Sequence, residues 1–163
     1  MSKVYIGMGT CGLATGAGKV REAVELWAKS RGKDVDITST GCIGFCQVEP
    51  IMDVVTPEGF RLSYGQVVPE DVDFLLDEVL IKNNYLLDGL LGQHESKAGR
   101  LEGIPLLSEH PFFRKQMKKV LRNCGVINPV SLDEYKASGG FVGLKNALAM
   151  EPKEVIDQVI ASG

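Results

Sequence analysis

The chain has 163 residues, of which 44% are hydrophobic and 24% charged, so it can form one folded domain with an extension. Its formal net charge of −3 argues against a general nucleic-acid binder, and no apolar run is long enough to span a membrane. Because the N-terminus lacks a signal-peptide core and four cysteines are present, we expect a cytoplasmic protein whose thiols serve metal or redox chemistry.

The first 88 residues predict a compact α/β domain. Strands show alternating apolar residues, and helices show apolar residues spaced i, i+3, i+4, i+7. The expected elements, in chain order, are a strand at 3–6, a helix from Gly18 to about Ser30, a strand at 34–38, a β-hairpin at 51–67 and a helix at 72–79. Gly32 would end the first helix in a left-handed cap. The predicted order is therefore β-α-β-β-β-α.

The rest of the chain predicts a linker and a helical arm. Residues 89–107 lose periodicity and gather glycine and charge, which is typical of a linker. Residues 108–163 predict helices at 110–122, 131–138, 141–148 and 152–162. The helix at 110–122 would carry five basic residues, and it is either a solvated face opposite a packed stripe or a docking surface for an acidic partner.

The loop after the first strand contains "GMGTCG", which matches the dinucleotide-binding pattern G-x-G-x-x-G. That pattern also requires an acidic residue at the end of the second strand, and here this strand ends in "TSTGC". A hairpin follows instead of another crossover helix. We therefore interpret the glycines as a turn.

The cysteines are more informative. Cys11 lies in the loop after the first strand, and Cys42 and Cys46 lie in the loop after the second. In a β-α-β unit the two parallel strands are neighbours, so these loops end at the same edge of the sheet and bring the three thiols together. Metal ligands, a redox pair formed by Cys42 and Cys46, and buried structural cysteines are the interpretations that this pattern leaves open.

At these residues the chain resembles a known family. Residues 1–88 are similar to the thioredoxin-like [2Fe–2S] ferredoxin domain of NADH dehydrogenases and hydrogenase flavoprotein subunits, which has C-x4-C in its first loop and C-x3-C in its second. "TGCIGFCQVEP" fits the second pattern, and Cys11 fits one cysteine of the first. The other position is Ile6, so the usual fourth ligand is absent.

No other residue fits the fourth position well. The nearby Met8, Thr10, Thr15, Ser39 and Thr40 are poor ligands for iron, and a Rieske-like site would need two histidines on one iron. Cys124 is the remaining thiol. It lies in "LRNCGVINP", which resembles a flavoprotein segment in which the cysteine is not a ligand, so we do not expect it to bind the cluster.

Residues 110–163 are similar to the lead-in of the NADH-binding flavoprotein subunit of complex I and of NAD(P)-linked hydrogenases. In that family the FMN loop, the NAD(H) site and a [4Fe–4S] cluster come after this lead-in. The resemblance therefore places these cofactors in a flavoprotein part that this chain lacks, and no catalytic, flavin-binding or nicotinamide-binding residue is expected in it.

We therefore predict an α/β, thioredoxin-like ferredoxin domain with metal ligands Cys11, Cys42 and Cys46, a linker and a helical arm. Its function would be one-electron transfer through a [2Fe–2S] cluster in an NAD(P)H-linked complex of the hydrogenase, formate dehydrogenase or NADH dehydrogenase type. The partners would be a flavoprotein and other redox subunits. The alternatives are an interaction module without a cluster and a thiol–disulfide protein.

Overall fold

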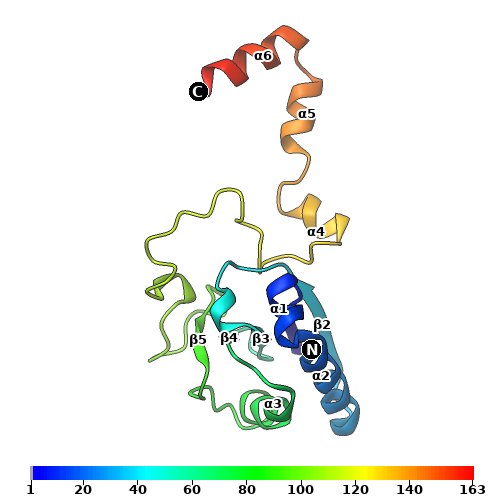
Figure 1. Cartoon of the computed structure of the whole chain (residues 1–163), viewed down its shortest axis with the longest axis vertical. Coiled ribbons are helices and arrows are strands. Elements are labelled where there is room, and N and C mark those ends of the chain that lie inside the picture. The colour runs from blue at the N-terminus through cyan, green and yellow to red at the C-terminus, as the bar shows by residue number, and fades with distance from the viewer. Residues whose placement is uncertain (1) are drawn as a thin grey trace. The chain divides into compact units, whose positions relative to one another are not determined.

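The computed structural model describes residues 2–163, which form two units, one through Asn128 and one from Pro129 to Gly163 (Figure 1). The elements of the first unit are β1 (Ser2–Gly7), α1 (Thr10–Thr15), α2 (Ala17–Arg31), β2 (Val35–Thr40), β3 (Met52–Val55), β4 (Arg61–Tyr64), α3 (Val72–Leu80) and β5 (Leu90–Gln93). Three short 3₁₀ helices lie at Cys46–Val48, Pro69–Asp71 and Leu107–Glu109. The predicted order β-α-β-β-β-α and the α/β class are confirmed.

The five strands form one mixed sheet in the order β2-β1-β3-β4-β5. β1 and β2 are parallel, with Gly7 opposite Thr40, whereas the other neighbours are antiparallel. Because β1 and β2 run in the same direction, the loops that follow them leave the sheet at the same edge. This edge carries the cysteines.

One face of the sheet is covered by α2 and α3. The core between them contains side chains from both helices and from alternate positions of the central strands, among them Val4, Trp27, Val54, Leu62 and Leu76. Trp27 is only 1% exposed, and its indole Nε1 donates to Asp77 of α3 at 2.8 Å. Gly32 ends α2 with a φ of 58°, as its sequence position predicted.

The segment 89–107, expected to be a linker, adds the edge strand β5. The sequence pattern missed β5 because it has four residues, one of them glycine, and gains its stability from backbone pairing with β4. The buried Gln93 side chain donates to the carbonyl of Leu101 at 2.8 Å and accepts from the Leu101 N–H at 2.9 Å. These two bonds fold the rest of the segment back onto the sheet.

The helix expected at 110–122 does not form, and this prediction is wrong. The segment consists of turns, with bonds such as Phe113 N to His110 O at 2.8 Å. Phe113 is buried, but the other apolar residues of the expected stripe are exposed, Met117 by 82% and Val120 by 94%. A helix of this amphipathic type forms when its apolar face packs on something, and most of this face is unpacked in the first unit.

The unit Pro129–Gly163 contains α4 (Leu132–Ala137), α5 (Val142–Leu148) and α6 (Pro152–Ala161), so the three other helices of the arm are confirmed. Ser131 caps α4 by accepting from the N–H of Glu134 at 3.2 Å. Apolar side chains of α5 and α6 are exposed by 54–77%: Val142, Leu144, Leu148, Ile156, Val159 and Ile160. Among residues 2–163, no helix is both long enough and apolar enough to cross a membrane.

Candidate metal centre

Cys11, expected in a loop, is the second residue of the short helix α1, which follows β1 after two residues. α1 begins at Thr10, and the N–H of Leu13 donates to the carbonyl of Gly9 at 2.9 Å. The next residue, Gly12, is buried against the end of β1, where a methyl group in its place would overlap the carbonyl oxygen of Gly7. This close packing fixes the first turn of α1, and therefore Cys11, relative to the sheet.

Cys42 and Cys46 lie in the loop after β2. The Met8 N–H donates to the carbonyl of Thr40 at 2.9 Å, which ties the two cysteine loops together at their bases. Gly44 has a φ of 90°, a left-handed conformation that favours glycine, and its N–H donates to Cys42 Sγ at 3.2 Å. The loop thus places a backbone donor on a sulfur, as expected for a site where hydrogen bonds tune a metal-bound thiolate.

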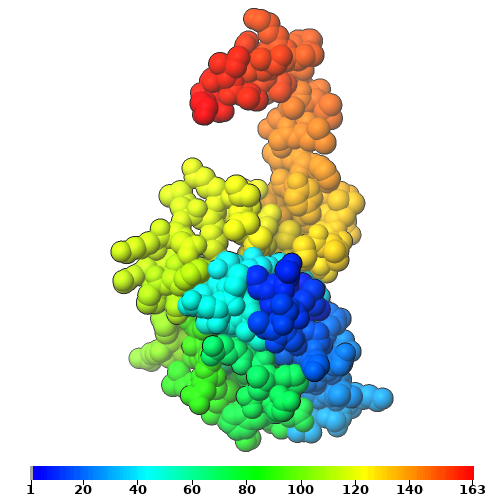
Figure 2. Space-filling view, in the orientation of Figure 1, coloured from blue at the N-terminus to red at the C-terminus, as the bar shows by residue number. Residues whose placement is uncertain are grey.

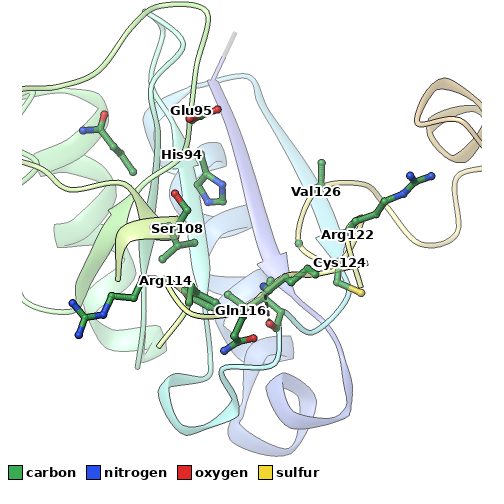
Figure 3. Close-up of a pocket in the computed structure, with 14 residues that line it drawn as sticks. His94, Glu95, Ser108, Arg114, Gln116, Arg122, Cys124 and Val126 are labelled. Atoms are coloured by element: carbon green, nitrogen blue, oxygen red, sulfur yellow. Dashed lines mark hydrogen bonds between the residues drawn. The ribbon is translucent and has the colours of Figure 1, made fainter. Parts of the chain in front are cut away.

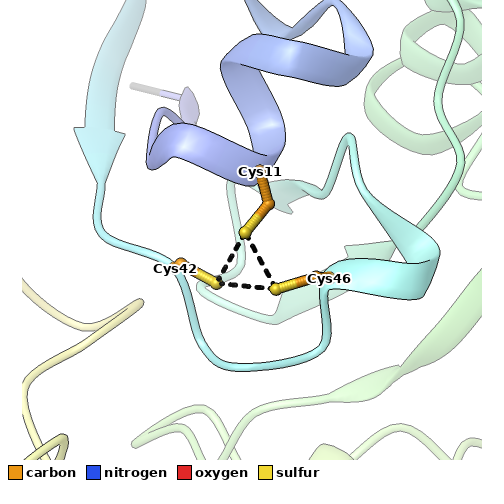
Figure 4. Close-up of side chains that lie close together, drawn as sticks. All are labelled: Cys11, Cys42 and Cys46. Atoms are coloured by element: carbon orange, nitrogen blue, oxygen red, sulfur yellow. Dashed lines mark hydrogen bonds between the residues drawn. The ribbon is translucent and has the colours of Figure 1, made fainter.

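The three sulfur atoms converge (Figure 4). Cys11 Sγ lies 2.8 Å from Cys46 Sγ and 3.9 Å from Cys42 Sγ, and the Cys42 and Cys46 sulfurs are 3.6 Å apart. All four cysteines of the chain are free thiols. The expectation that the fold brings these three cysteines to one edge of the sheet is confirmed. Their role as metal ligands stays a prediction.

Hydrogen bonds among the three thiols change the pKa of Cys46. The bond with Cys11, followed by the bond with Cys42, raises the pKa of Cys46 to about 12. A thiol with this pKa is protonated at neutral pH and is a weak nucleophile. Metal binding therefore has to displace the proton, as it does wherever thiolates ligate a metal.

Ile6 takes no part in the site. Its side chain is fully buried in the core, on the helix-covered face of the sheet. Three nearby hydroxyl groups considered as replacements have other partners: Thr15 donates to the carbonyl of Cys11, Ser39 accepts from Arg21, and Thr40 donates to the carbonyl of Ile6. The position that the sequence resemblance marks as the missing fourth ligand is therefore part of the hydrophobic core.

An aromatic cluster supports the cysteine loop. Phe45, which precedes Cys46, is 3% exposed; its ring stacks on Phe112 with centroids 4.1 Å apart and meets Phe113 edge-on at 5.5 Å. The Lys118 ammonium lies over the Phe113 ring and donates to the carbonyl of Ile43 at 3.0 Å. The segment 110–126 is thereby held against the loop, an arrangement that the helical interpretation of this segment did not predict.

A cavity of about 600 Å³ lies between this segment and the region around β5 (Figure 3). Its lining includes His94, Gln116, Lys118 and Cys124, whereas the charged ends of Arg114 and Arg122 extend away from its centre. Cys124, which lines this cavity, lies beside Gly41 at the start of the cysteine loop.

A buried polar network lies on the sheet face opposite the helices. Asp53 of β3 accepts from the Ser63 hydroxyl at 2.6 Å and pairs with Arg61 at 2.5 Å and with His94 at 3.3 Å. Burial would raise the pKa of Asp53, but the charge of Arg61 and the contacts with His94 lower it to about 2. The only sequence signal for this network was a charged residue inside the apolar strand "IMDVV".

Comparisons with known proteins agree with the resemblance drawn from the sequence. No family model matches the chain. It is 48% identical over 50 residues to the NADP-reducing hydrogenase subunit HndC of Solidesulfovibrio fructosivorans, and 48% identical over 44 residues to a protein named "Ferredoxin, 2Fe-2S" from Aquifex aeolicus. These matches cover 31% and 27% of this chain, but only 10% of the hydrogenase subunit and 37% of the ferredoxin.

Crystal structures of the thioredoxin-like [2Fe–2S] ferredoxin from Aquifex aeolicus match with 22–23% identity. For the Cys55Ser variant of that ferredoxin the TM-score is 0.49, with 56% of this chain and 98% of the ferredoxin covered. For the wild type the TM-score is 0.48, with 56% and 96% covered.

Proposed function

We propose that this chain is an electron-transfer domain that holds a [2Fe–2S] cluster on Cys11, Cys42 and Cys46 and passes one electron at a time. The observation that carries the proposal is the convergence of three thiols, one from α1 and two from the loop after β2, within 4.8 Å of one another. Such a cluster supplies a reversible one-electron couple.

The residues present can fill three of the four ligand positions of a [2Fe–2S] cluster. Iron–sulfur clusters are held by cysteine thiolates, and the three candidate ligands are thiols that range from half-buried to exposed. The chain's own contribution is to orient these sulfurs and to adjust the potential. Gly44 does so through its hydrogen bond to Cys42 Sγ, and Phe45 excludes water beneath the loop.

We further propose that the parent assembly is an NAD(P)H-linked redox complex in the cytoplasm, of the hydrogenase, formate dehydrogenase or NADH dehydrogenase type. Support comes from the similarity to a hydrogenase subunit. A flavoprotein domain or subunit would be the direct partner and would carry FMN, NAD(H) and a [4Fe–4S] cluster. The exposed apolar side chains of α5 and α6 offer it a surface to cover.

The test is anaerobic purification followed by a visible spectrum, iron and sulfide assays, and EPR after dithionite reduction. We expect about two irons and two sulfides per chain and an EPR signal in the reduced state. Cys11→Ser should lose most of the iron, whereas Leu13→Ala, an exposed neighbour on α1, should keep it. If the folded chain contains no iron, even after incubation with ferrous iron and sulfide, electron transfer is refuted and the interaction module remains as the function.

One distance favours a second candidate, a thiol–disulfide protein. The 2.8 Å between Cys11 Sγ and Cys46 Sγ is the shortest separation in the group, so these two residues would form the bond more readily than Cys42 and Cys46, which are 3.6 Å apart. Thiol counting on the iron-free protein, before and after treatment with a reductant, tests this reading. Four free thiols in both samples would refute it.

A further inference from the structure

Cys124 lies beside the cysteine loop, although it is 78 residues from Cys46 in the sequence. A methyl group placed on Gly41 would be 3.9 Å from Cys124 Sγ, so this sulfur lies beside the residue that precedes Cys42. The Cys124 side chain is half-buried, and Figure 3 shows its sulfur at the edge of the cavity described above.

Two anchors hold the segment that carries Cys124. On its N-terminal side, Lys118 donates to the carbonyl of Ile43, between Cys42 and Cys46. On its C-terminal side, Arg61 donates to the carbonyl of Gly125. Gly125 has a φ of 75°, and its backbone is so close to Ile43 that a methyl group there would overlap the Ile43 side chain. The thiol between these anchors is therefore presented to the loop.

We propose that Cys124 is the fourth ligand of the cluster. This inference rests on the proposed function. A [2Fe–2S] cluster takes four protein ligands, and the chain has four cysteines, three of which already converge. Ile6, at the family's usual position, is buried in the core and cannot serve. In this chain the missing ligand then comes from a different part of the sequence.

A binuclear cluster takes two protein ligands on each of its irons. Cys11, Cys42 and Cys46 supply three converging thiols, and Cys124, beside Gly41, supplies a fourth candidate. Each thiol gives up a proton when its sulfur binds iron, and no oxidant or reductant is consumed.

Charge also favours this placement. Four thiolates around an oxidised cluster leave a net negative charge, which needs compensation close by. The Lys118 ammonium donates to the carbonyl of Ile43, the residue after Cys42, at 3.0 Å, and it lines the same cavity as Cys124. Lys118 therefore provides a cation beside the sulfurs.

The test compares four forms of the full chain after anaerobic reconstitution with ferrous iron and sulfide and removal of small thiols: wild type, Cys124→Ser, Cys124→Ala and the control Val120→Ser, which changes an exposed side chain of the same segment. The readouts are iron and sulfide content, Fe–S stretching bands in resonance Raman, EPR after reduction, and the rate of iron release to a chelator. Far-UV circular dichroism of the iron-free forms reports folding.

We expect an oxygen ligand in Cys124→Ser to shift the Raman bands and the EPR signal. Cys124→Ala should release iron at least about tenfold faster than wild type, as loss of a ligand requires, and Val120→Ser should match wild type. Unchanged spectra and release rates in both Cys124 variants, with two irons per wild-type chain, would overturn the assignment and leave the proposed function intact. Wild type without iron would overturn both, and one cluster per chain dimer would overturn ligation within one chain.

Discussion

Gly12 should be the position at which a single methyl group most directly displaces a cluster ligand. The residue follows Cys11 in α1, and a methyl group there would meet the carbonyl oxygen of Gly7 and, at 3.2 Å, the carboxylate of Glu49. The first obstacle is backbone in the central strand β1, so it cannot rotate away. Gly12→Ala must therefore push α1 outward, and Cys11 moves with it.

The expected change in the free energy of unfolding combines two opposing effects. Overpacking in a well-packed region costs about 1–3 kcal/mol, whereas replacing glycine by alanine inside a helix gains about 0.5–1 kcal/mol. Gly18, in α2, has open space where its methyl group would lie, so Gly18→Ala receives the gain alone. The two variants should differ by about 2 kcal/mol in the free energy of unfolding, or roughly 6–8 °C in melting temperature for a unit of this size.

The assay is urea and thermal unfolding of both variants without iron, followed by chelator-driven iron release after reconstitution. Gly12→Ala should be less stable than wild type and should release iron at least about tenfold faster, because the Cys11 sulfur is displaced. Gly18→Ala should be slightly more stable and should release iron at the wild-type rate. Equal stability and equal release for the two variants would show that α1 does not position Cys11 against β1.

Three further predictions concern the surroundings of the site. Phe45→Ala should lower the free energy of unfolding by about 3–5 kcal/mol, the usual cost of removing a buried phenylalanine, and should loosen the cysteine loop in hydrogen exchange. The depressed pKa of Asp53 should add about 2 kcal/mol of stability that is present above pH 4 and lost as the pH falls toward 2; urea titrations across that range should show a smaller loss in Asp53→Asn. Since Cys46 has a pKa of about 12, iron affinity should rise with pH between 7 and 9, as measured by competition with a chelator.

The sequence predicted most of the first unit because its signals were local. Alternation marked the central strands, and the Val20–Trp27 spacing together with Gly32 marked α2. The parallel pairing of β1 with β2 then placed Cys11 beside Cys42 and Cys46 without any contact information. A pattern of this kind fails where stability comes from distant partners, as in β5, whose Gln93 side chain binds the backbone of Leu101.

The basic segment 114–122 shows the same limit more sharply. Its residues have helical spacing, but Phe112 and Phe113 pack on Phe45, and the apolar stripe beyond them remains exposed in the first unit. Figure 2 shows this yellow-green part of the chain on the surface. Sequence periodicity reports which residues could share a face, but it does not report which of them find a partner.

A fourth ligand at Cys124, instead of at the position of Ile6, also changes which part of the chain the cluster is attached to. A ligand at that position would belong to β1, a strand paired on both sides within the sheet, whereas Cys124 belongs to a segment held by Lys118 and Arg61. With Cys124 as ligand, the cluster would add a link through iron to the contacts of Lys118 and Phe112 that already hold this segment against the loop. Cluster loading would then stabilise the segment further, because the cluster binds only the folded arrangement.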